Sequence, residues 1–107
     1  RGLGDVYKRQ AQGLARTYVE VRKYGYYRAY QQMRQKGLTK PIIEEALEEY
    51  SEGTYERLYE LVERKYLRYL DGEKGDIKVK NALVRLGYSY DIIKEVLADI
   101  KQEYGDE

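Results

Sequence analysis

A ten-residue stretch of this chain occurs twice. The first copy, KGLTKPIIEE, spans residues 36–45, and the second, LGYSYDIIKE, spans residues 86–95. A chain that repeats itself at a fixed period of about 20–50 residues is typical of stacked supersecondary units, each too small to bury its apolar face alone. The repeat therefore constrains the fold more than any other feature of the sequence. At the offset of 50 residues the identical pairs are Gly37/Gly87, Ile42/Ile92, Ile43/Ile93, Glu45/Glu95 and Leu47/Leu97.

Each copy has the residues of a tight corner between two helices. Gly37 and Gly87 suit the left-handed residue that ends a helix, because a side chain there would clash with the backbone. Two positions later, the hydroxyl groups of Thr39 and Ser89 can accept hydrogen bonds from the free N–H groups of the next helix. Pro41 falls in the first turn of that helix, where a missing N–H costs little.

The residues before the caps complete each corner. Leu38 and Tyr88 are expected to fold back on Ile43 and Ile93, four positions into the next helix, as a hydrophobic staple. One such corner is weak evidence, but two at a fixed spacing predict a duplicated helix–corner–helix unit.

Apolar residues at helical spacing predict six helices, and no segment alternates with the period of two that strands require. The sequence therefore predicts an all-α fold of two tandem three-helix repeats, residues 11–52 and 53–107. Thr54 is the expected cap of a long fourth helix, and the two units are expected to pack together. Residues 1–10 have no counterpart in the repeat and are expected to be a non-native leader. The expected apolar helix faces fall in residues 11–23, 27–36, 42–50, 55–70, 77–86 and 92–104.

The side-chain inventory removes several kinds of site. The 107 residues include no cysteine and no histidine, so disulfides, thiolate ligands and the usual general base are excluded. We expect no metal, no cofactor and no enzymatic activity. No apolar run approaches the roughly 20 residues that cross a bilayer, so no membrane partner is expected and an intracellular location is the default. Tyrosine is the only aromatic residue, with 14 copies, and a buried phenol group needs a hydrogen-bond partner.

The net charge of +1 conceals a segregation of charge along the chain. Residues 1–40 contain ten Lys or Arg and two Asp or Glu. Residues 41–63 contain one basic residue and eight acidic residues. The pattern then repeats, with eight basic and four acidic residues in 64–94, and one and five in 95–107. Basic residues that precede each corner are therefore the candidates for binding a partner or DNA: Arg16, Arg22, Lys23, Arg28, Arg34, Lys36, Lys65, Arg68, Lys78, Lys80 and Arg85.

Other interpretations of these charges stay open. A solvated helix face explains the basic residues about equally well, and the acidic run 44–63 is also best interpreted as solvated. Tyr24, Tyr26 and Tyr27 can stack on nucleic-acid bases, although a structural role is the commoner use of such residues. A helix-turn-helix that reads duplex DNA is disfavoured, because the helix after the first corner carries carboxylates that would repel phosphates: Glu44, Glu45, Glu48 and Glu49.

Three phrases of the sequence carry a family resemblance. They are LARTYVEVR at residues 14–22, MRQKGL at residues 33–38 and LVRLGYSYDIIKEVL at residues 83–97. With them, residues 11–104 resemble the RecX family of bacterial recombinase regulators. The family typically shows a basic pair, Gly-Phe-Ser, Tyr and an Ile-rich helix, whereas here Leu86 replaces one basic residue and Tyr88 replaces the Phe. The family usually has three repeats, and the two in this chain resemble the middle and the last.

The resemblance implies a non-enzymatic, cytoplasmic protein that binds the RecA recombinase filament on DNA and modulates it, usually by restraining it. We expect a monomer with weak, salt-sensitive binding to DNA alone. A general nucleic-acid-binding helical module and a structural or designed repeat without activity are the alternatives. The expected functional surface is the basic face of the first two helices of each repeat, and not the acidic third helices.

Overall fold

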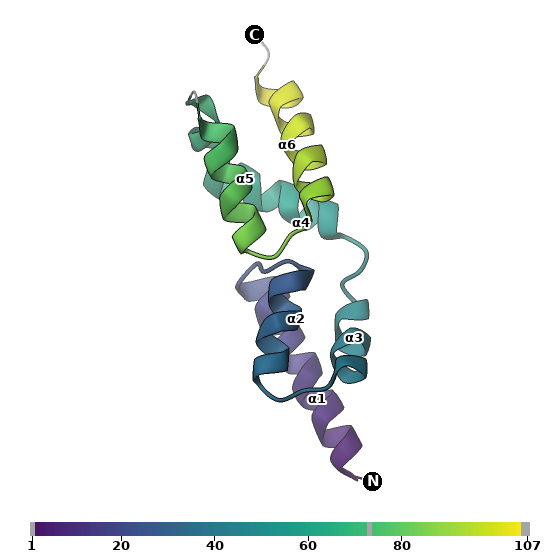
Figure 1. Cartoon of the computed structure of the whole chain (residues 1–107). Helices are drawn as coiled ribbons and strands as arrows, with labels where there is room; N and C mark the ends of the chain where they lie inside the picture. The colour runs from purple at the N-terminus through teal and green to yellow at the C-terminus, as the bar shows by residue number, and fades with distance from the viewer. Residues whose placement is uncertain (1, 73, 106–107) are drawn as a thin grey trace.

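The chain folds into two three-helix units that stack end to end (Figure 1). The computed structural model describes residues 2–72 and 74–105, and within those ranges it contains helices and no strand. The predicted all-α fold of two tandem three-helix repeats is thus confirmed. The molecule is elongated, with extents of 60 × 21 × 20 Å. Within the described ranges, no helix combines the length and the apolar character that crossing a membrane requires.

The first unit consists of α1 (Gly2–Arg16), a π-helical turn η1 (Thr17–Val21), α2 (Tyr26–Gln35) and α3 (Lys40–Glu48). Helix α1 begins well before the expected residue 11, but residues 4–10 are exposed and the first buried side chain is Ala11. The assignment of residues 1–10 to a leader stays a prediction. The core of this unit is formed by Ala11, Ala15, Tyr18, Val19, Ala29, Met33, Leu38, Ile43, Ala46 and Leu47.

The second unit consists of α4 (Thr54–Leu61), η2 (Val62–Tyr66), η3 (Leu67–Asp71), α5 (Gly75–Arg85) and α6 (Tyr90–Tyr104). The expected single helix over residues 55–70 is therefore wrong in detail, because it passes from α-helix through a π-helical turn into a 3₁₀ turn. A 3₁₀ turn places residues three apart on one side, so both Leu67 and Leu70 pack against the core. That core is formed by Leu58, Leu61, Val62, Val79, Leu83, Tyr88, Ile93, Val96, Leu97 and Ile100.

Both corners have the predicted backbone. Gly37 and Gly87 have φ values of +94° and +102°. The N–H of Gly37 donates to the Arg34 carbonyl at 2.9 Å, and the N–H of Leu38 donates to the Met33 carbonyl at 3.2 Å. These two bonds form the Schellman motif that ends a helix. The second corner has the same two bonds at 2.9 and 3.2 Å.

The two caps differ. Ser89 occupies the N-cap of α6, and its hydroxyl accepts a hydrogen bond from the Ile92 N–H at 3.4 Å. Thr39 occupies the N-cap of α3 but makes no such bond, so the predicted hydroxyl cap is wrong there. Thr54 is the first residue of α4 and not its cap, since left-handed Gly53 takes the cap position.

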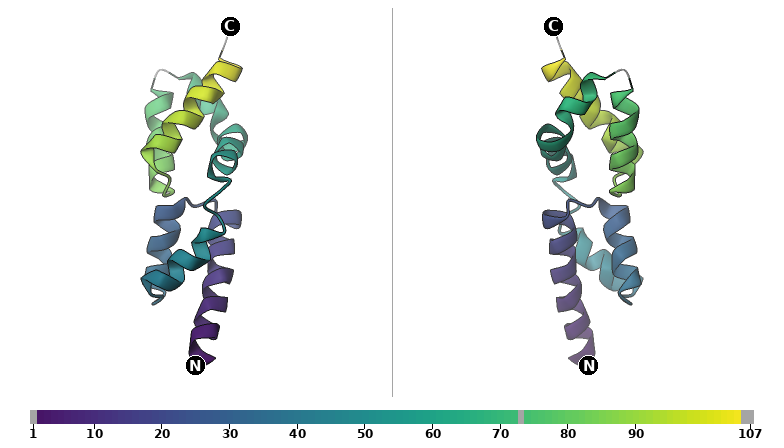
Figure 2. Two further views of the ribbon diagram at one scale, coloured as in Figure 1. Left: turned by 90° about the vertical axis from the view of Figure 1, so that its right-hand side faces the viewer. Right: turned by 90° about the vertical axis from the view of Figure 1, so that its left-hand side faces the viewer.

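The two hydrophobic cores are separate. Each cluster of buried residues draws on one unit only, so the units do not share the common core that a compact two-repeat domain would have. Figure 2 shows instead that the end of one unit meets the end of the other, with α5 above α2 in both views. The expectation that the units pack together is met through loops rather than through apolar faces. The exact boundary between residues 52 and 53 stays a prediction.

Candidate interaction site at the repeat junction

The two units meet where the α5–α6 corner rests on the α1–α2 loop. The N–H of Gly25 donates to the carbonyl of Leu86 at 2.8 Å, and the N–H of Tyr27 donates to the carbonyl of Gly87 at 3.1 Å. The N–H of Tyr27 lies in the first turn of α2, where backbone donors have no partner within their own helix. The second unit thus supplies carbonyl acceptors to donors that the first unit leaves unpaired.

Two glycines make this approach feasible. A Cβ atom added to Gly25 would lie 2.5 Å from the carbonyl carbon of Gly87, and one added to Gly87 would lie 2.4 Å from the backbone nitrogen of Arg28. Contacts this short with backbone atoms cannot be relieved by a side-chain rotation. Both positions therefore require glycine for the contact, and Gly87 requires it for its positive φ as well.

A tyrosine ties the corner to the loop from the other side. Tyr88 is buried, and its hydroxyl donates to the Lys23 carbonyl at 2.7 Å. Burial raises the pKa of Tyr88 to about 12, because ionisation would place a charge among apolar side chains. Lys23 has a φ of +62°, the one positive value at a non-glycine residue in the described chain. Such strain in a loop is tolerated where the surroundings fix it, as the bond from Tyr88 does here.

Arg28 braces the same junction. Its Nη1 donates to the Arg85 carbonyl at 3.2 Å, and its guanidinium lies 4.8 Å from the centroid of the Tyr24 ring. The guanidinium groups of Arg28 and Arg22 lower the pKa of the Tyr24 phenol below its usual value. The Arg28 Nε atom is buried and has no hydrogen-bond partner within the described residues. Arg28 is therefore partly a structural residue and not simply a free surface cation.

The junction gathers basic residues that are far apart in the sequence. Arg22 and Arg85 are exposed, and Lys23 and Arg28 are half-buried; we call these four the junction cluster. They come from the end of the first helical segment, its following loop, α2 and α5. None of the four has a carboxylate within ion-pair distance in the described part of the chain.

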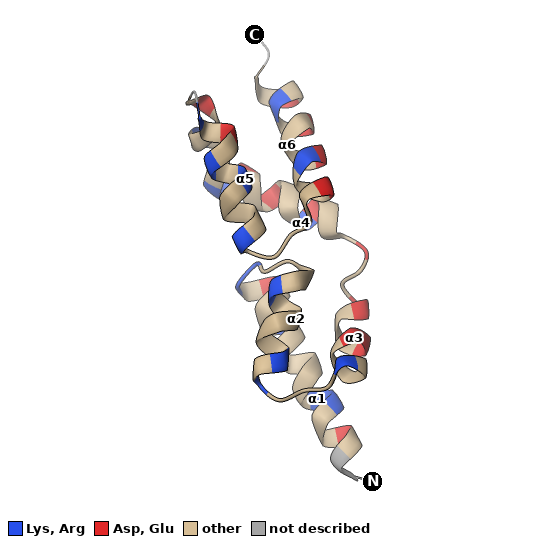
Figure 3. Ribbon diagram, viewed as in Figure 1, with Lys and Arg blue, Asp and Glu red and all other residues tan. Residues whose placement is uncertain are grey.

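The other candidates lie away from the junction. Lys36 directly follows the last residue of α2, about 12 Å beyond Arg28 at a rise of 1.5 Å per residue. Arg34 donates to the Leu38 carbonyl at 3.2 Å, so it too has a structural contact. Figure 3 shows that basic residues mark both α2 and α5, which follow one another along the molecule. Arg16 is exposed at the end of α1, Lys65 and Arg68 are exposed on η2 and η3, and Lys78 and Lys80 are on α5.

Comparison with known families assigns both units. The family model described as the second three-helix domain of RecX matches residues 8–47, and that described as the third matches residues 52–97. The chain belongs to the RecX family. The curated "Regulatory protein RecX" of Clostridioides difficile (strain 630) is 34% identical over 90 residues, a span that covers 81% of this chain. The chain covers 42% of that relative's length, and no solved structure matches it significantly.

Both departures from the typical RecX phrase lie at the junction. At Leu86, where the resemblance led us to expect a basic residue, the backbone carbonyl accepts from Gly25. At Tyr88, where it led us to expect phenylalanine, the hydroxyl donates to Lys23. The backbone contact is thus independent of the side chain at residue 86, whereas the phenol bond depends on this chain's own tyrosine.

Helix α4 lies within the acidic run 44–63. Helix α4 is the first helix of the second repeat, yet its exposed side carries Glu56 and Glu60 and is acidic. Its tyrosines join it to α6: the hydroxyls of Tyr55 and Tyr59 donate to Asp99 and Glu103. The candidates from the predicted helix over residues 55–70, Lys65 and Arg68, lie beyond α4 on η2 and η3, and the basic face stays a prediction. Within the described residues, no group of acidic side chains is arranged to hold a metal ion.

Arg57 is a structural residue that the sequence analysis did not single out. Its Nη2 donates to the Tyr50 carbonyl at 2.7 Å and its Nη1 donates to the Glu52 carbonyl at 3.3 Å. It thereby fixes the linker between α3 and α4 and satisfies a carbonyl beyond the end of α3. One signal could have indicated this role, because Arg57 is the one basic residue among residues 41–63.

Proposed function

We propose that this chain is a RecX-type regulator that binds the RecA recombinase filament on DNA as a monomer and restrains its ATPase and recombination activities. Membership of the RecX family supports the partner. The name of the C. difficile relative, a regulatory protein, supports a regulatory role and not a catalytic one. The observation that supports the docking surface is the junction cluster, in which basic residues of both units converge without carboxylate partners in the described chain.

An elongated regulator with basic residues along α2 and α5 suits a partner that is itself long and carries bound, negatively charged DNA. Long-range attraction would guide docking, and it would be screened beyond about 8 Å at physiological salt. The same residues give weak binding to DNA alone, because only a few can contact one backbone at once. Each phosphate contact contributes about −0.9 to the log–log salt slope on duplex DNA and about −0.7 on single strands.

The test is the DNA-dependent ATPase activity of RecA with and without this protein. The wild-type chain should slow ATP hydrolysis. The double variant Arg22→Glu/Arg85→Glu reverses two exposed charges of the junction cluster and spares the side chain of Arg28. It should need about tenfold more protein for the same restraint, which corresponds to about 1.4 kcal/mol of binding free energy.

The matched control is Glu44→Lys/Glu48→Lys, which reverses two exposed charges on α3. It should restrain the ATPase at least as well as the wild-type chain. A wild-type chain with no effect on RecA would contradict the proposed function. If the control loses restraint and the junction variant keeps it, the acidic α3 is the docking surface instead. Helical circular dichroism of both variants should match that of the wild type.

A further inference from the structure

The solvent-facing side of α5 carries exposed apolar side chains. Ile77 is 58% exposed and Val84 is 46% exposed. The two residues are seven positions apart, so two turns of the helix place them on the same side, about 10 Å apart along the axis. We call these two residues the apolar row. The core of the second unit is formed from the opposite side of α5, by Val79 and Leu83, and does not use the apolar row.

Cations lie on both sides of the apolar row. Lys78 and Arg85 each follow one of its members directly, so they form a second row that is rotated by about 100° from the first. Lys80 lies on the other side. None of the three has a carboxylate within ion-pair distance among the described residues. The one carboxylate of α5, that of Asp76, pairs with Lys101, so the exposed side of α5 is apolar along its middle and positive at its edges.

The first unit continues this face. Tyr27 is the counterpart of Ile77 at the repeat offset of 50 residues, and it is 62% exposed. Its N–H donates to the Gly87 carbonyl across the junction, and the N–H of Gly87 donates to the Val84 carbonyl at 2.9 Å. Residues 26–36 contain no Asp or Glu. The apolar row and Tyr27 therefore follow one another along the molecule, as α5 and α2 do in Figure 2.

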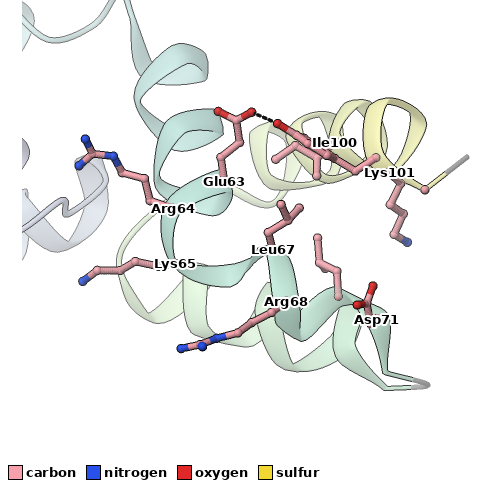
Figure 4. Close-up of a pocket in the computed structure, with 11 residues that line it drawn as sticks. Glu63, Arg64, Lys65, Leu67, Arg68, Asp71, Ile100 and Lys101 are labelled. Carbon is pink, nitrogen blue, oxygen red and sulfur yellow. Dashed lines mark hydrogen bonds between the residues drawn. The ribbon is translucent and has the colours of Figure 1, made fainter.

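A pocket elsewhere in the second unit lacks this combination. It measures about 630 Å³ and lies between η2–η3 and the end of α6 (Figure 4). Leu67, Leu70 and Ile100 form its apolar part. The charged groups of Lys65 and Arg68 project to the side of Leu67 that is opposite Ile100, away from the pocket. Its apolar part and these cations face different ways, so one partner does not contact both.

The chemistry of the α5 face favours a protein surface over a nucleic acid. An apolar centre with a polar, charged rim is the ordinary anatomy of a protein–protein interface. Single-stranded nucleic acid is held by aromatic rings that stack on its bases, and Ile77 and Val84 offer no ring. Contacts to phosphates would use the cations and leave the apolar row unexplained. The face therefore fits a protein surface on which apolar side chains are accompanied by carboxylates.

We propose that the exposed side of α5, continued by Tyr27, contacts the recombinase protein of the filament and not its DNA. The contacted surface would carry apolar side chains opposite the apolar row and Tyr27, and carboxylates opposite Lys78, Lys80 and Arg85. This inference rests on the proposed function and adds to it the class of surface that is recognised. Burial of the apolar row supplies affinity, whereas the cations guide the approach and set the orientation. Arg85 belongs both to this face and to the junction cluster.

The first test is restraint of the RecA ATPase by Ile77→Ser, which removes an exposed aliphatic side chain and keeps the net charge. About tenfold more of this variant should be needed for the same restraint, as expected when an interface loses one aliphatic side chain. Its affinity for a fluorescent single-stranded oligonucleotide alone, measured by anisotropy, should stay within about twofold of the wild type. Helical circular dichroism should be unchanged, because residue 77 is exposed.

The matched control is Val6→Ser. Val6 is 56% exposed on α1, outside the α5 face. This variant should restrain the ATPase as the wild-type chain does, within about twofold.

The second test identifies the molecule that α5 contacts. The chain has no cysteine, so Ile77→Cys can carry a single benzophenone crosslinker. Irradiation with the assembled filament should attach the labelled chain to RecA. The same label on Val6→Cys should give no such product.

The outcomes separate this inference from the proposed function. A wild-type chain without effect on RecA would contradict the proposed function, and this inference with it. Full restraint by Ile77→Ser, or an equal loss in Val6→Ser, would overturn this inference alone. So would a loss of DNA affinity in Ile77→Ser that equals its loss of restraint. A crosslink from residue 77 to DNA, or to a second copy of the chain, in place of RecA would overturn it as well.

Discussion

The corners at Gly37 and Gly87 have the same local structure and different surroundings. Both glycines have φ near +100°, and both corners close with the same pair of Schellman hydrogen bonds. A Cβ atom added to Gly37 would meet nothing within 4 Å, whereas one added to Gly87 would lie 2.4 Å from the backbone of Arg28. The first corner is exposed, and the second is the joint between the units.

This difference shows how a duplicated motif acquires two roles. At residue 37 the backbone conformation alone favours glycine, because a Cβ atom is unfavourable on a left-handed residue that ends a helix. At residue 87 a long-range contact adds a second requirement, which no local pattern indicates. The residue that follows differs in the same way, since Leu38 only packs in its core, whereas Tyr88 also donates to the partner unit. Substitutions at paired positions can therefore separate the local effect from the effect of the joint.

The largest expected effect is the contrast between Gly87→Ala and Gly37→Ala. A left-handed alanine costs about 1–2 kcal/mol, which is the whole effect expected at Gly37. At Gly87 the clash with Arg28 adds about 1–3 kcal/mol, as for an overpacked site. Urea unfolding, monitored by circular dichroism, should show a larger loss of stability for Gly87→Ala than for Gly37→Ala. Equal losses at the two positions would show that the second corner is as free as the first.

The next largest effect, that of Gly25→Ala, separates the contact between the two units from the strain of a positive φ. Gly25 has a φ of −80°, so alanine is unstrained there, and only the contact with Gly87 opposes the added methyl group. We expect Gly25→Ala to lower the free energy of unfolding by about 1–3 kcal/mol. Exposed Gly13 within α1 is the matched control, and alanine there should stabilise the chain by about 0.5–1 kcal/mol. Stabilisation by Gly25→Ala would contradict the close approach of the two loops.

A smaller effect tests the phenol bond alone. Tyr88→Phe keeps the packed ring and removes the hydroxyl that donates to Lys23. The expected loss is about 0.5–1.5 kcal/mol, the usual net contribution of one hydrogen bond. Thermal unfolding should detect it, and an unchanged transition would show that the Lys23 carbonyl finds an equal partner in water.

The smallest effect concerns the ionisation of tyrosines in the two units. Carboxylates raise the pKa of Tyr55 and of Tyr104 to about 12, mainly through hydrogen bonds from the phenols to Asp99 and Glu63. Folded-state values above the ordinary pKa of about 10 mean that these bonds stabilise the chain below pH 10. This contribution is lost as the pH rises from about 10 to 12.

Tyr24 of the first unit is the internal comparison for that titration, because the nearby Arg28 guanidinium lowers its pKa. A titration of the tyrosine ring carbons by NMR should therefore show Tyr24 ionising before Tyr55 and Tyr104. The reverse order would contradict the charge environments assigned to the two units.

Local features of the fold could be predicted from the sequence, and the joint could not. The corner at Gly87 follows from glycine, a hydroxyl cap and apolar spacing, all within a few residues. The bond from Gly25 to Leu86 joins residues that are far apart in the chain, so no local pattern indicates it. The same reason explains Arg28, which sequence patterns present as a surface cation and which in fact donates to Arg85.

The sequence predicts which basic residues belong to the candidate site, but not how they are arranged in space. Basic blocks before each corner indicate a basic face, but they do not indicate that Arg28 contacts the carbonyl of Arg85 across the junction. The pocket at Leu67 and Leu70 follows from a 3₁₀ turn, which apolar spacing could not separate from continued α-helix.

Amide hydrogen exchange at Gly25 and Tyr27 tests the joint most directly. In the wild-type chain both N–H groups donate across the joint, so both should be protected from exchange although they lie outside any helical ladder. In Gly87→Ala both should lose protection, while the amide of buried Met33 in the first core stays protected. Exchange of Gly25 and Tyr27 at the rate of an unstructured peptide in the folded wild-type chain would contradict the account.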